Sequence, residues 1–319
     1  MPHQGANKSE LASTPGGSAT LAGHRVARIG YGAMQLDRHR QDPEVAIRVL
    51  RHAIDHGVDH IDTAQFYGDG FVNSVIARAI DADSDVVIAS KVGAATNPGG
   101  AHPMRPAQRP AELRAAVEDN LRALGRERLP LVNLRRLEIG PGLAATGEQI
   151  VDVDDQMAEM VAMRDEGKIG EIGISAVRIE TVRHLLPAGI ACVQNPYSVL
   201  DRRFESLLDL CLEHEMAWVP YFPLGSAFPG IPKVGENPVV IDIARDLDVT
   251  PAQVGLAWLL AHSPNTLLIP GTSDIRHLDA NLAVSDITLS PESITTLDGL
   301  GAATTTAPID APQWPAQAH

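Results

Sequence analysis

Residues 43–91 are PEVAIRVLRHAIDHGVDHIDTAQFYGDGFVNSVIARAIDADSDVVIASK, and this stretch decides the fold. Two amphipathic runs of helix length, 43–57 and 70–82, alternate with two short apolar runs, 58–62 and 86–91. Pro43 at a first helical position and Gly57 after a last one mark the bounds of the first helix. Alternating strands and helices predict a parallel sheet covered by helices.

The same alternation continues outward in both directions. A hairpin is expected at 18–29, and two long loops at 93–109 and 225–237. Eight β-rich runs, each followed by a helix and joined without a linker, favour a closed (β/α)8 TIM barrel over an open sheet. We therefore expect an α/β chain with one barrel domain at 19–301, a flexible tail at 1–18 and an irregular tail at 302–319. The expected strands are 29–35, 58–62, 86–91, 129–134, 169–175, 191–194, 218–221 and 266–269, and the expected helices are 43–57, 70–82, 110–124, 154–166, 179–186, 203–214, 238–247, 251–261, 274–284 and 291–299.

Composition narrows the classes of partner. The formal net charge of −14 argues against nucleic acid and anionic membranes. Cys192 and Cys211 form no CxxC pair, and no apolar run reaches the roughly 18 residues that a spanning helix needs, so a reducing, cytoplasmic location is expected. The three histidines at spacing four (His52, His56 and His60) lack the further ligands of a zinc site, and no metal is expected. A monomer and a small homo-oligomer both fit the sequence.

Three residues at or near neighbouring strand ends form a candidate catalytic set. Asp62 ends one expected strand, Lys91 ends the next, and Tyr67 follows Asp62 in a loop. Carbonyl reduction creates an alkoxide that needs a proton, and a phenol with a pKa near 10 donates one only where its anion is stabilised. A nearby ammonium supplies that stabilisation, and a carboxylate keeps the ammonium charged and oriented. The set predicts a carbonyl reductase with Tyr67 as general acid.

Several segments resemble the aldo-keto reductases, in the family's order and over residues 20 to 300, and the whole resembles the pyridoxal reductase-like branch of bacteria. They are Arg28-Ile29-Gly30-Tyr31-Gly32-Ala33-Met34, His60-Ile61-Asp62-Thr63, Phe66-Tyr67-Gly68, Ser90-Lys91, Gly170-Glu171-Ile172-Gly173-Ile174-Ser175, Val193-Gln194-Asn195-Pro196-Tyr197-Ser198 and Leu268-Ile269-Pro270-Gly271-Thr272-Ser273. The resemblance implies an NADP(H)-dependent barrel reductase with an Asp-Tyr-Lys-His tetrad.

The fourth member of that tetrad is exchanged in this chain. Asp62, Tyr67 and Lys91 match three members, but Arg135 occupies the position of the histidine. Arginine stays protonated and cannot share a proton with Tyr67. Two interpretations stay open: Arg135 donates hydrogen bonds to the substrate, or it pairs with a carboxylate such as Glu138 or Asp62 and only shapes the site.

The resemblance also implies a cofactor site at the strand ends, because Gly30-Tyr31-Gly32 is no dinucleotide fingerprint. Ser175 and Gln194 would hold the nicotinamide carboxamide. Asn195 would compensate for Ala176, which stands where the family has an asparagine. Tyr221 would stack on the ring, with Leu224 close by. The 2′-phosphate would meet Gly271, Thr272, Ser273 and His277 at a helix N-terminus, and Asn281 would contact adenine. Thr272 or Ser273 would cap that helix.

These inferences predict an NADPH-dependent reduction of an aldehyde or ketone, with pyridoxal, reduced to pyridoxine, as the first expected substrate. A reductase of broad aldehyde and ketone specificity is one alternative. A barrel that binds NADP(H) for regulation, with weak catalysis, is the other. The intact Asp62, Tyr67 and Lys91 set argues against the regulatory alternative.

Overall fold

The computed structural model describes residues 14–100, 102–140, 142–226 and 231–301. Of the tails expected at 1–18 and 302–319, residues 1–13 and 302–319 lie outside these ranges. The N-terminal boundary expected at residue 18 falls too late, because strand β1 already begins at Ser18 and the Gly16 N–H donates to Ser285 Oγ at 2.8 Å. Among the described residues, no helix is both long and apolar enough to span a membrane.

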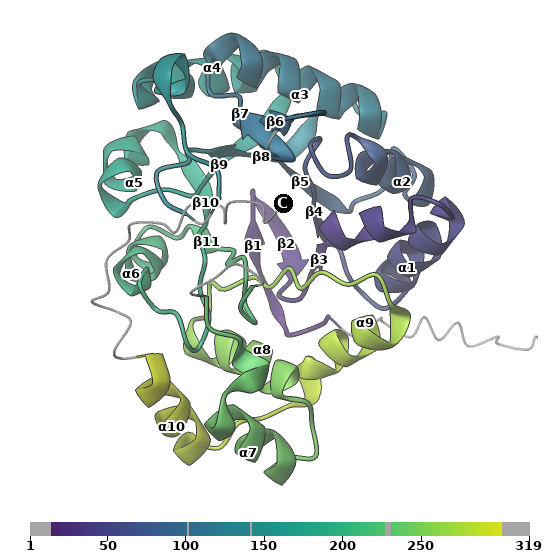
Figure 1. The fold of residues 1–319 in the computed structure, drawn as a ribbon, viewed down its shortest axis with the longest axis vertical. Coiled ribbons are helices and arrows are strands. Elements are labelled where there is room, and N and C mark those ends of the chain that lie inside the picture. The colour runs from purple at the N-terminus through teal and green to yellow at the C-terminus, as the bar shows by residue number, and fades with distance from the viewer. Residues whose placement is uncertain (1–13, 101, 141, 227–230, 302–319) are drawn as a thin grey trace, which may run out of the picture.

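Seven of the described strands form a curled parallel sheet, in the order β11-β10-β9-β8-β5-β4-β3. Parallel bridges from Trp218 to Thr266 and from Leu268 to Ile29 join its two edges through the segment 266–268. Helices lie around the outside of this ring (Figure 1), which confirms the predicted (β/α)8 barrel. The strands are β3 (Tyr31–Gly32), β4 (His60–Asp62), β5 (Val87–Val92), β8 (Leu129–Arg135), β9 (Ile169–Ser175), β10 (Ile190–Gln194) and β11 (Ala217–Trp218).

The helices begin and end where local chemistry favours it. Proline occupies the first turn of α1, α3, α7 and α8, where its missing N–H is not needed. Gly125 ends α3 in the left-handed conformation, with φ 62°. The helices are α1 (Pro43–Asp55), α2 (Phe71–Ala79), α3 (Pro110–Leu124), α4 (Val153–Asp165), α5 (Ile179–Leu185), α6 (Glu205–Glu213), α7 (Pro238–Asp246), α8 (Pro251–His262), α9 (Ile275–Leu282) and α10 (Pro291–Gly301).

Several expected elements differ from the structure. The strand expected at 266–269 forms only isolated bridges at Thr266 and Leu268, and the strand expected at 218–221 is only β11. The first barrel strand, expected at 29–35, is only β3, because a 3-10 helix takes over at Ala33–His39. The loop expected at 93–109 contains a hairpin of β6 (Ala94–Thr96) and β7 (Met104–Pro106), which Asn97 supports by donating from Nδ2 to the His102 carbonyl at 3.1 Å. Most of this hairpin is half-buried or exposed, so its side chains give no alternating apolar pattern.

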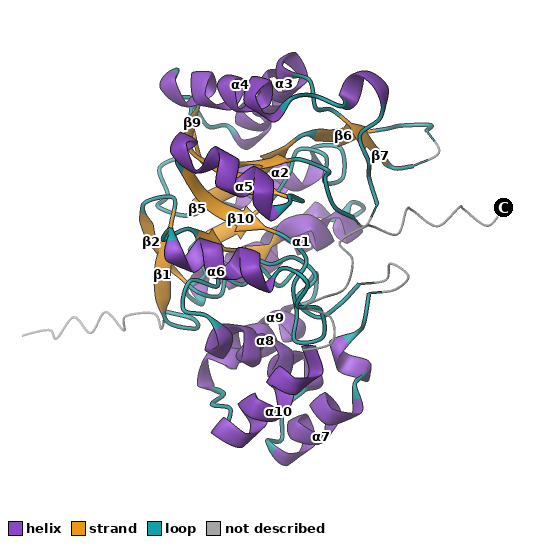
Figure 2. Ribbon diagram, turned by 90° about the vertical axis from the view of Figure 1, so that its left-hand side faces the viewer, coloured by secondary structure: helices purple, strands orange, loops and turns teal. Residues whose placement is uncertain are grey.

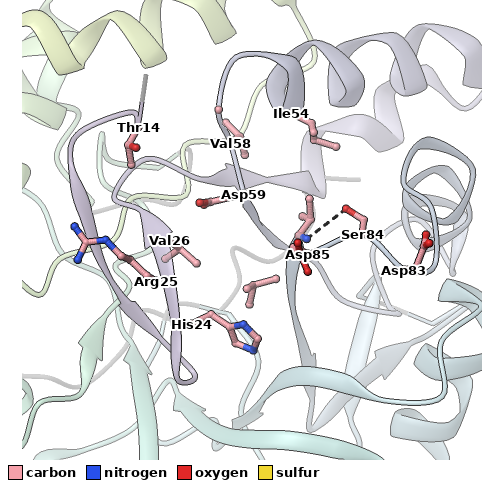
Figure 3. A pocket seen from close by; sticks show the side chains of 13 residues that line it. Thr14, His24, Arg25, Val26, Ile54, Val58, Asp59, Asp83, Ser84 and Asp85 are labelled. Atoms are coloured by element: carbon pink, nitrogen blue, oxygen red, sulfur yellow. Dashed lines mark hydrogen bonds between the residues drawn. The ribbon is translucent and has the colours of Figure 1, made fainter. Parts of the chain in front are cut away.

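The hairpin of β1 (Ser18–Leu21) and β2 (His24–Ala27) closes the N-terminal end of the barrel. Leu21 and Val26 from this hairpin pack with Val87 and Leu131 inside the ring. Figure 2 shows this hairpin and the β6–β7 hairpin at opposite ends of the molecule. A cavity of about 700 Å³ lies beside the β1–β2 hairpin, lined by residues that include Arg25, Asp59 and Asp85 (Figure 3). It contains none of the expected site residues, which sit where the strands end.

Candidate active site

Asp62 and Lys91 form a buried ion pair at the C-terminal ends of β4 and β5. Lys91 Nζ pairs with Asp62 Oδ1 and also donates to the Thr63 carbonyl at 3.1 Å. The two residues are 4% and 8% exposed, respectively. Burial alone would lower the pKa of Lys91, but Asp62 and Tyr67 outweigh it and hold that pKa above its usual value. The ammonium is therefore kept charged inside the barrel, as predicted from the sequence.

Tyr67 lies beside this ion pair. Lys91 Nζ is 5.1 Å from the centre of the Tyr67 ring, and Phe66 meets the same ring edge-on, with 5.2 Å between centroids. The following Gly68 has φ 60°, and its carbonyl accepts a hydrogen bond from Arg40. A Cβ at position 68 would lie 2.1 Å from Asp37 Oδ1, so glycine is required for this close approach. The turn after Tyr67 is thus fastened to the 3-10 helix.

Gln194 ends β10 and extends the network. Its Nε2 donates to Asp62 Oδ2 at 2.9 Å, so both oxygens of the Asp62 carboxylate are used. Gln194 Oε1 is buried and has no hydrogen-bond partner within the described part of the chain. A buried acceptor without a partner is costly, and a primary amide such as the nicotinamide carboxamide would satisfy it. Ser175 is the residue that pairs with Gln194 across β9 and β10. This part of the site fits the expected cofactor.

Asn195 holds the turn that follows β9. Its Nδ2 donates to the Val177 carbonyl at 2.8 Å, and its Oδ1 accepts from the Val177 N–H at 3.1 Å. Both ends of the amide therefore hold the turn after Ser175, in which Ala176 has φ 51°. One N–H and one oxygen lone pair of this amide remain, so the expectation that Asn195 compensates for the asparagine that Ala176 replaces stays a prediction.

Arg135 ends β8 beside Ser175 and is half-buried. Its guanidinium has no hydrogen bond or ion pair with any described residue, because the carboxylates proposed for it are taken. Glu138 pairs with Arg136 at 2.9 Å, and Asp62 holds Lys91 and Gln194. Burial raises the pKa of Tyr221 to about 12, although Arg135 and Arg203 oppose the rise, so the Arg135 charge lies near this phenol. The interpretation that Arg135 pairs with Glu138 or Asp62 is wrong.

The expected phosphate end of the site is built differently from the prediction. Asp274 caps α9, because its Oδ1 accepts from the N–H groups of Arg276 and His277 at 2.9 and 3.3 Å. The cap expected at Thr272 or Ser273 is therefore wrong, and α9 begins one residue later than expected. Asp is among the best capping residues, so its side chain takes the position. It also brings a negative charge to the place where a phosphate is expected.

The other residues expected here surround this cap. Thr272 is buried, its Oγ1 accepts from the Asp274 N–H at 3.1 Å, and its carbonyl accepts from the Tyr31 hydroxyl. The Ser273 carbonyl contacts His39 Nε2 at 2.7 Å. Gly271 and His277 are exposed, while Asn281 and Leu224 are half-buried.

No group of three metal-ligating side chains occurs among the described residues. His52 contacts Asp279 through Nε2 at 2.6 Å, and His56 Nδ1 contacts the His52 carbonyl at 2.7 Å. The third histidine of the series, His60, points elsewhere: it is buried under the barrel strands against Gly30.

Comparisons with known proteins agree with this site. The Aldo/keto reductase family model matches residues 28–302. The chain is 40% identical over 295 residues to pyridoxine 4-dehydrogenase of Escherichia coli, covering 88% of this chain and 97% of that protein. It is 29% identical to a methylglyoxal reductase of the same organism, covering 85% and 89% of the two chains. An aldo-keto reductase from Klebsiella pneumoniae, crystallised with NADPH, has a TM-score of 0.75 and 27% identity, covering 91% of this chain and 97% of that one. The resemblance predicted from the motifs is confirmed, and the chain belongs to the aldo/keto reductase family.

Proposed function

We propose that this aldo/keto reductase reduces pyridoxal to pyridoxine with NADPH, and that Tyr67 donates the proton. The observation that carries the proposal is the Arg135 guanidinium, which has no hydrogen bond or ion pair with a described residue, at the barrel end that holds the Asp62–Lys91 pair. The relative that is 40% identical is named for the oxidation of pyridoxine, which is the reverse reaction.

The chain is an NADP-dependent oxidoreductase, in agreement with its family and with relatives crystallised with NADPH or NADP. Gln194 and Ser175 would hold the carboxamide, Tyr221 and Leu224 would line the ring, and the segment 271–281 would meet the adenosine phosphate. When bound, NADPH supplies the hydride that adds to the carbonyl carbon. The buried Gln194 Oε1 supports this assignment, because a carboxamide N–H would give it the partner it lacks.

Proton transfer falls to the residues of the chain. As the carbonyl becomes an alkoxide, the Tyr67 hydroxyl gives its proton to that oxygen and becomes tyrosinate. The Lys91 ammonium, 5.1 Å from the ring centre, stabilises the tyrosinate, and Asp62 keeps the ammonium charged. Water then returns a proton to Tyr67, so the net change is addition of one hydride and one proton.

Arg135 would select the substrate. Pyridoxal carries an acidic hydroxyl next to its aldehyde, and a guanidinium donates charge-assisted hydrogen bonds to such an oxygen. Because arginine stays protonated, Arg135 acts as a fixed cation and does not exchange protons with Tyr67.

A second candidate is a reductase of broad aldehyde specificity. An apolar cluster that includes Phe66, Leu137 and Leu143 packs against Tyr67. Such a surface suits alkyl or aryl aldehydes that have no acidic group, and the methylglyoxal reductase relative acts on a small aldehyde by name.

The test follows NADPH absorbance with pyridoxal, methylglyoxal and 4-nitrobenzaldehyde. Pyridoxal should give the highest kcat/KM, and Tyr67→Phe should reduce kcat by at least about a hundredfold. Equal efficiency with all three aldehydes would favour the broad reductase. Absence of NADPH oxidation with any of them would overturn the assignment, and full activity in Tyr67→Phe would overturn the mechanism.

A further inference from the structure

Gln108 lies at a junction of two strand ends, just before α3. Its side chain is buried, and its Nε2 donates to the Gly93 carbonyl at 2.5 Å and to the Arg135 carbonyl at 2.8 Å. Gly93 follows β5, which carries Lys91, and Arg135 ends β8. One amide therefore ties together the ends of the two strands that carry these cations.

The approach of these two ends depends on Gly93. Its φ is 98°, and a Cβ there would lie 2.5 Å from the Arg135 carbonyl oxygen and 2.8 Å from Gln108 Nε2. Only glycine tolerates that combination of backbone conformation and contact. The Gln108 amide fills the remaining space between the two carbonyls, so it sets their separation.

Gln108 is itself held in one orientation. Gln156, from α4, donates to the Gln108 carbonyl at 2.6 Å and to its Oε1 at 3.0 Å, while the Gln108 N–H donates to Gln149 Oε1 at 2.6 Å. Because Oε1 already accepts, Nε2 must face Gly93 and Arg135, and a flipped amide would lose the three bonds of the side chain. The Gln108 side chain is thus held in place by residues of the helices outside the barrel.

The neighbouring Arg135 and Arg136 differ in how their side chains are held. Arg136 donates to Gln156 Oε1 and pairs with Glu138 at 2.9 Å. Arg135 is held through its backbone alone, and its guanidinium has no partner among the described residues. The position of the Arg135 guanidinium therefore depends on the backbone at the end of β8, which the pairing with Ser175 and the Gln108 amide hold in place.

We propose that Gln108 is a positioning residue for substrate recognition: it fixes the end of β8 so that the Arg135 guanidinium meets the acidic oxygen beside the carbonyl. The inference rests on the proposed function of Arg135, and it adds Gln108 as the residue through which the barrel scaffold sets the specificity. Misplacing a recognition group by a fraction of a bond length weakens binding without removing the chemistry.

The test uses two aldehydes that differ by one hydroxyl, 3-hydroxypyridine-4-carboxaldehyde and pyridine-4-carboxaldehyde. The measured quantity is the ratio of their kcat/KM values. Gln108→Met keeps the size of the side chain but removes both donors, and it should lower this ratio about fivefold, mainly through the KM of the hydroxylated aldehyde. Asn265→Leu is the matched control. It removes the hydrogen bond of 3.0 Å that the Asn265 side-chain amide donates to the Met216 carbonyl at the opposite end of the barrel, and it should leave the ratio unchanged.

A double-variant cycle with Arg135→Met separates the two proposals. If Gln108 acts through Arg135, Gln108→Met should change the ratio less than twofold once Arg135→Met is present. A ratio that Arg135→Met does not lower would overturn the proposed role of Arg135. If Arg135→Met lowers it and Gln108→Met does not, only the inference about Gln108 is wrong. An equal effect of Gln108→Met in both backgrounds also contradicts it, because that marks general loosening. Should Gln108→Met fail to fold, Gln156→Leu, which removes the anchor of Gln108 together with the acceptor of Arg136, should lower the ratio in the same direction.

Discussion

Asp62→Asn is the substitution that most directly tests the buried ion pair. Both Asp62 oxygens accept hydrogen bonds, one from Lys91 and one from Gln194 at 2.9 Å. An asparagine has only one acceptor oxygen, so its NH2 group must face one of these two donors. The Lys91 ammonium would then stay buried without a counter-charge. Removing one partner of such a pair costs about 3–5 kcal/mol, which for a barrel of this size lowers Tm by roughly 5–8 °C at neutral pH.

The linkage between protonation and folding predicts how the Tm difference between Asp62→Asn and the wild type changes with pH. In the wild type, Asp62 holds the pKa of Lys91 above its ordinary value of 10.5, so the stability it contributes is present below pH 10.5 and lost above it. In Asp62→Asn, burial remains without the carboxylate, and it lowers the pKa of Lys91. The unfolded variant then binds more protons than the folded one just below pH 10.5, and the stability of the variant rises with pH. The Tm difference between variant and wild type should therefore narrow from pH 7 to pH 10.

Thermal unfolding followed by circular dichroism measures this difference. The kcat of the variant should fall at least about tenfold relative to the wild type toward pH 10, where Lys91 gives up its proton and tyrosinate loses its stabilising ammonium. Asp59→Asn is the control: Asp59 precedes β4 and accepts the Ala27 N–H at 2.9 Å, but none of the lysines that the structure describes pairs with it. Its Tm difference should be small and constant with pH. A Tm difference for Asp62→Asn that stays constant from pH 7 to pH 10 would refute the reasoning.

Three further predictions follow from other parts of the structure. Asp274→Ser keeps a capping side chain but removes the negative charge at the start of α9, where the phosphate of NADPH is expected. The KM for NADPH should therefore fall about threefold relative to the KM for NADH, and Asp279→Ser, one turn further along, should change this ratio of KM values less. Gly93→Ala should cost at least about 2 kcal/mol in urea unfolding because its Cβ meets the Arg135 carbonyl, whereas Gly99→Ala, with φ 75° and open space, should cost about 1 kcal/mol; equal losses would contradict the close contact. Glu205 is half-buried, and hydrogen bonds from His262, Arg202 and Tyr197 outweigh that burial and lower its pKa to about 2, so Glu205→Gln should be less stable than the wild type by about 2 kcal/mol at pH 7 after solvent screening, and the gap should close as pH falls from 4.5 to 2.

The sequence predicted the barrel and the Asp62–Lys91 pair for one physical reason. Parallel strands end at a common rim, so residues that end successive strands must lie together there. This logic needs only strand bounds, which apolar periodicity supplies. It also brought Gln194 and Arg135 to the same rim.

The roles that the sequence left open depend on bonds between side chains and turns. Asn195 and Gln194 are adjacent amides, yet Asn195 faces the turn after β9 and Gln194 faces Asp62. Nothing in their spacing distinguishes the two, because the strand ends between them and the alternation of side chains stops. Asp274 and Gln108 were missed for a related reason: each acts on backbone groups whose positions are fixed only when distant segments meet.

Asp62 gains a second role from this arrangement. A carboxylate can only accept hydrogen bonds, so Gln194 must turn its Nε2 toward Asp62 and leave Oε1 for another partner. The proposed cofactor site therefore inherits its amide orientation from the same residue that keeps Lys91 charged. A glutamate at position 194 would bring a second carboxylate oxygen to within about 3 Å of Asp62, and one of the two would have to take up a proton. In the proposed function, Asp62 therefore orients both Gln194, which would hold the hydride donor, and Lys91, which stabilises the tyrosinate. Position 62 should for this reason tolerate neither a neutral amide nor a shorter acceptor.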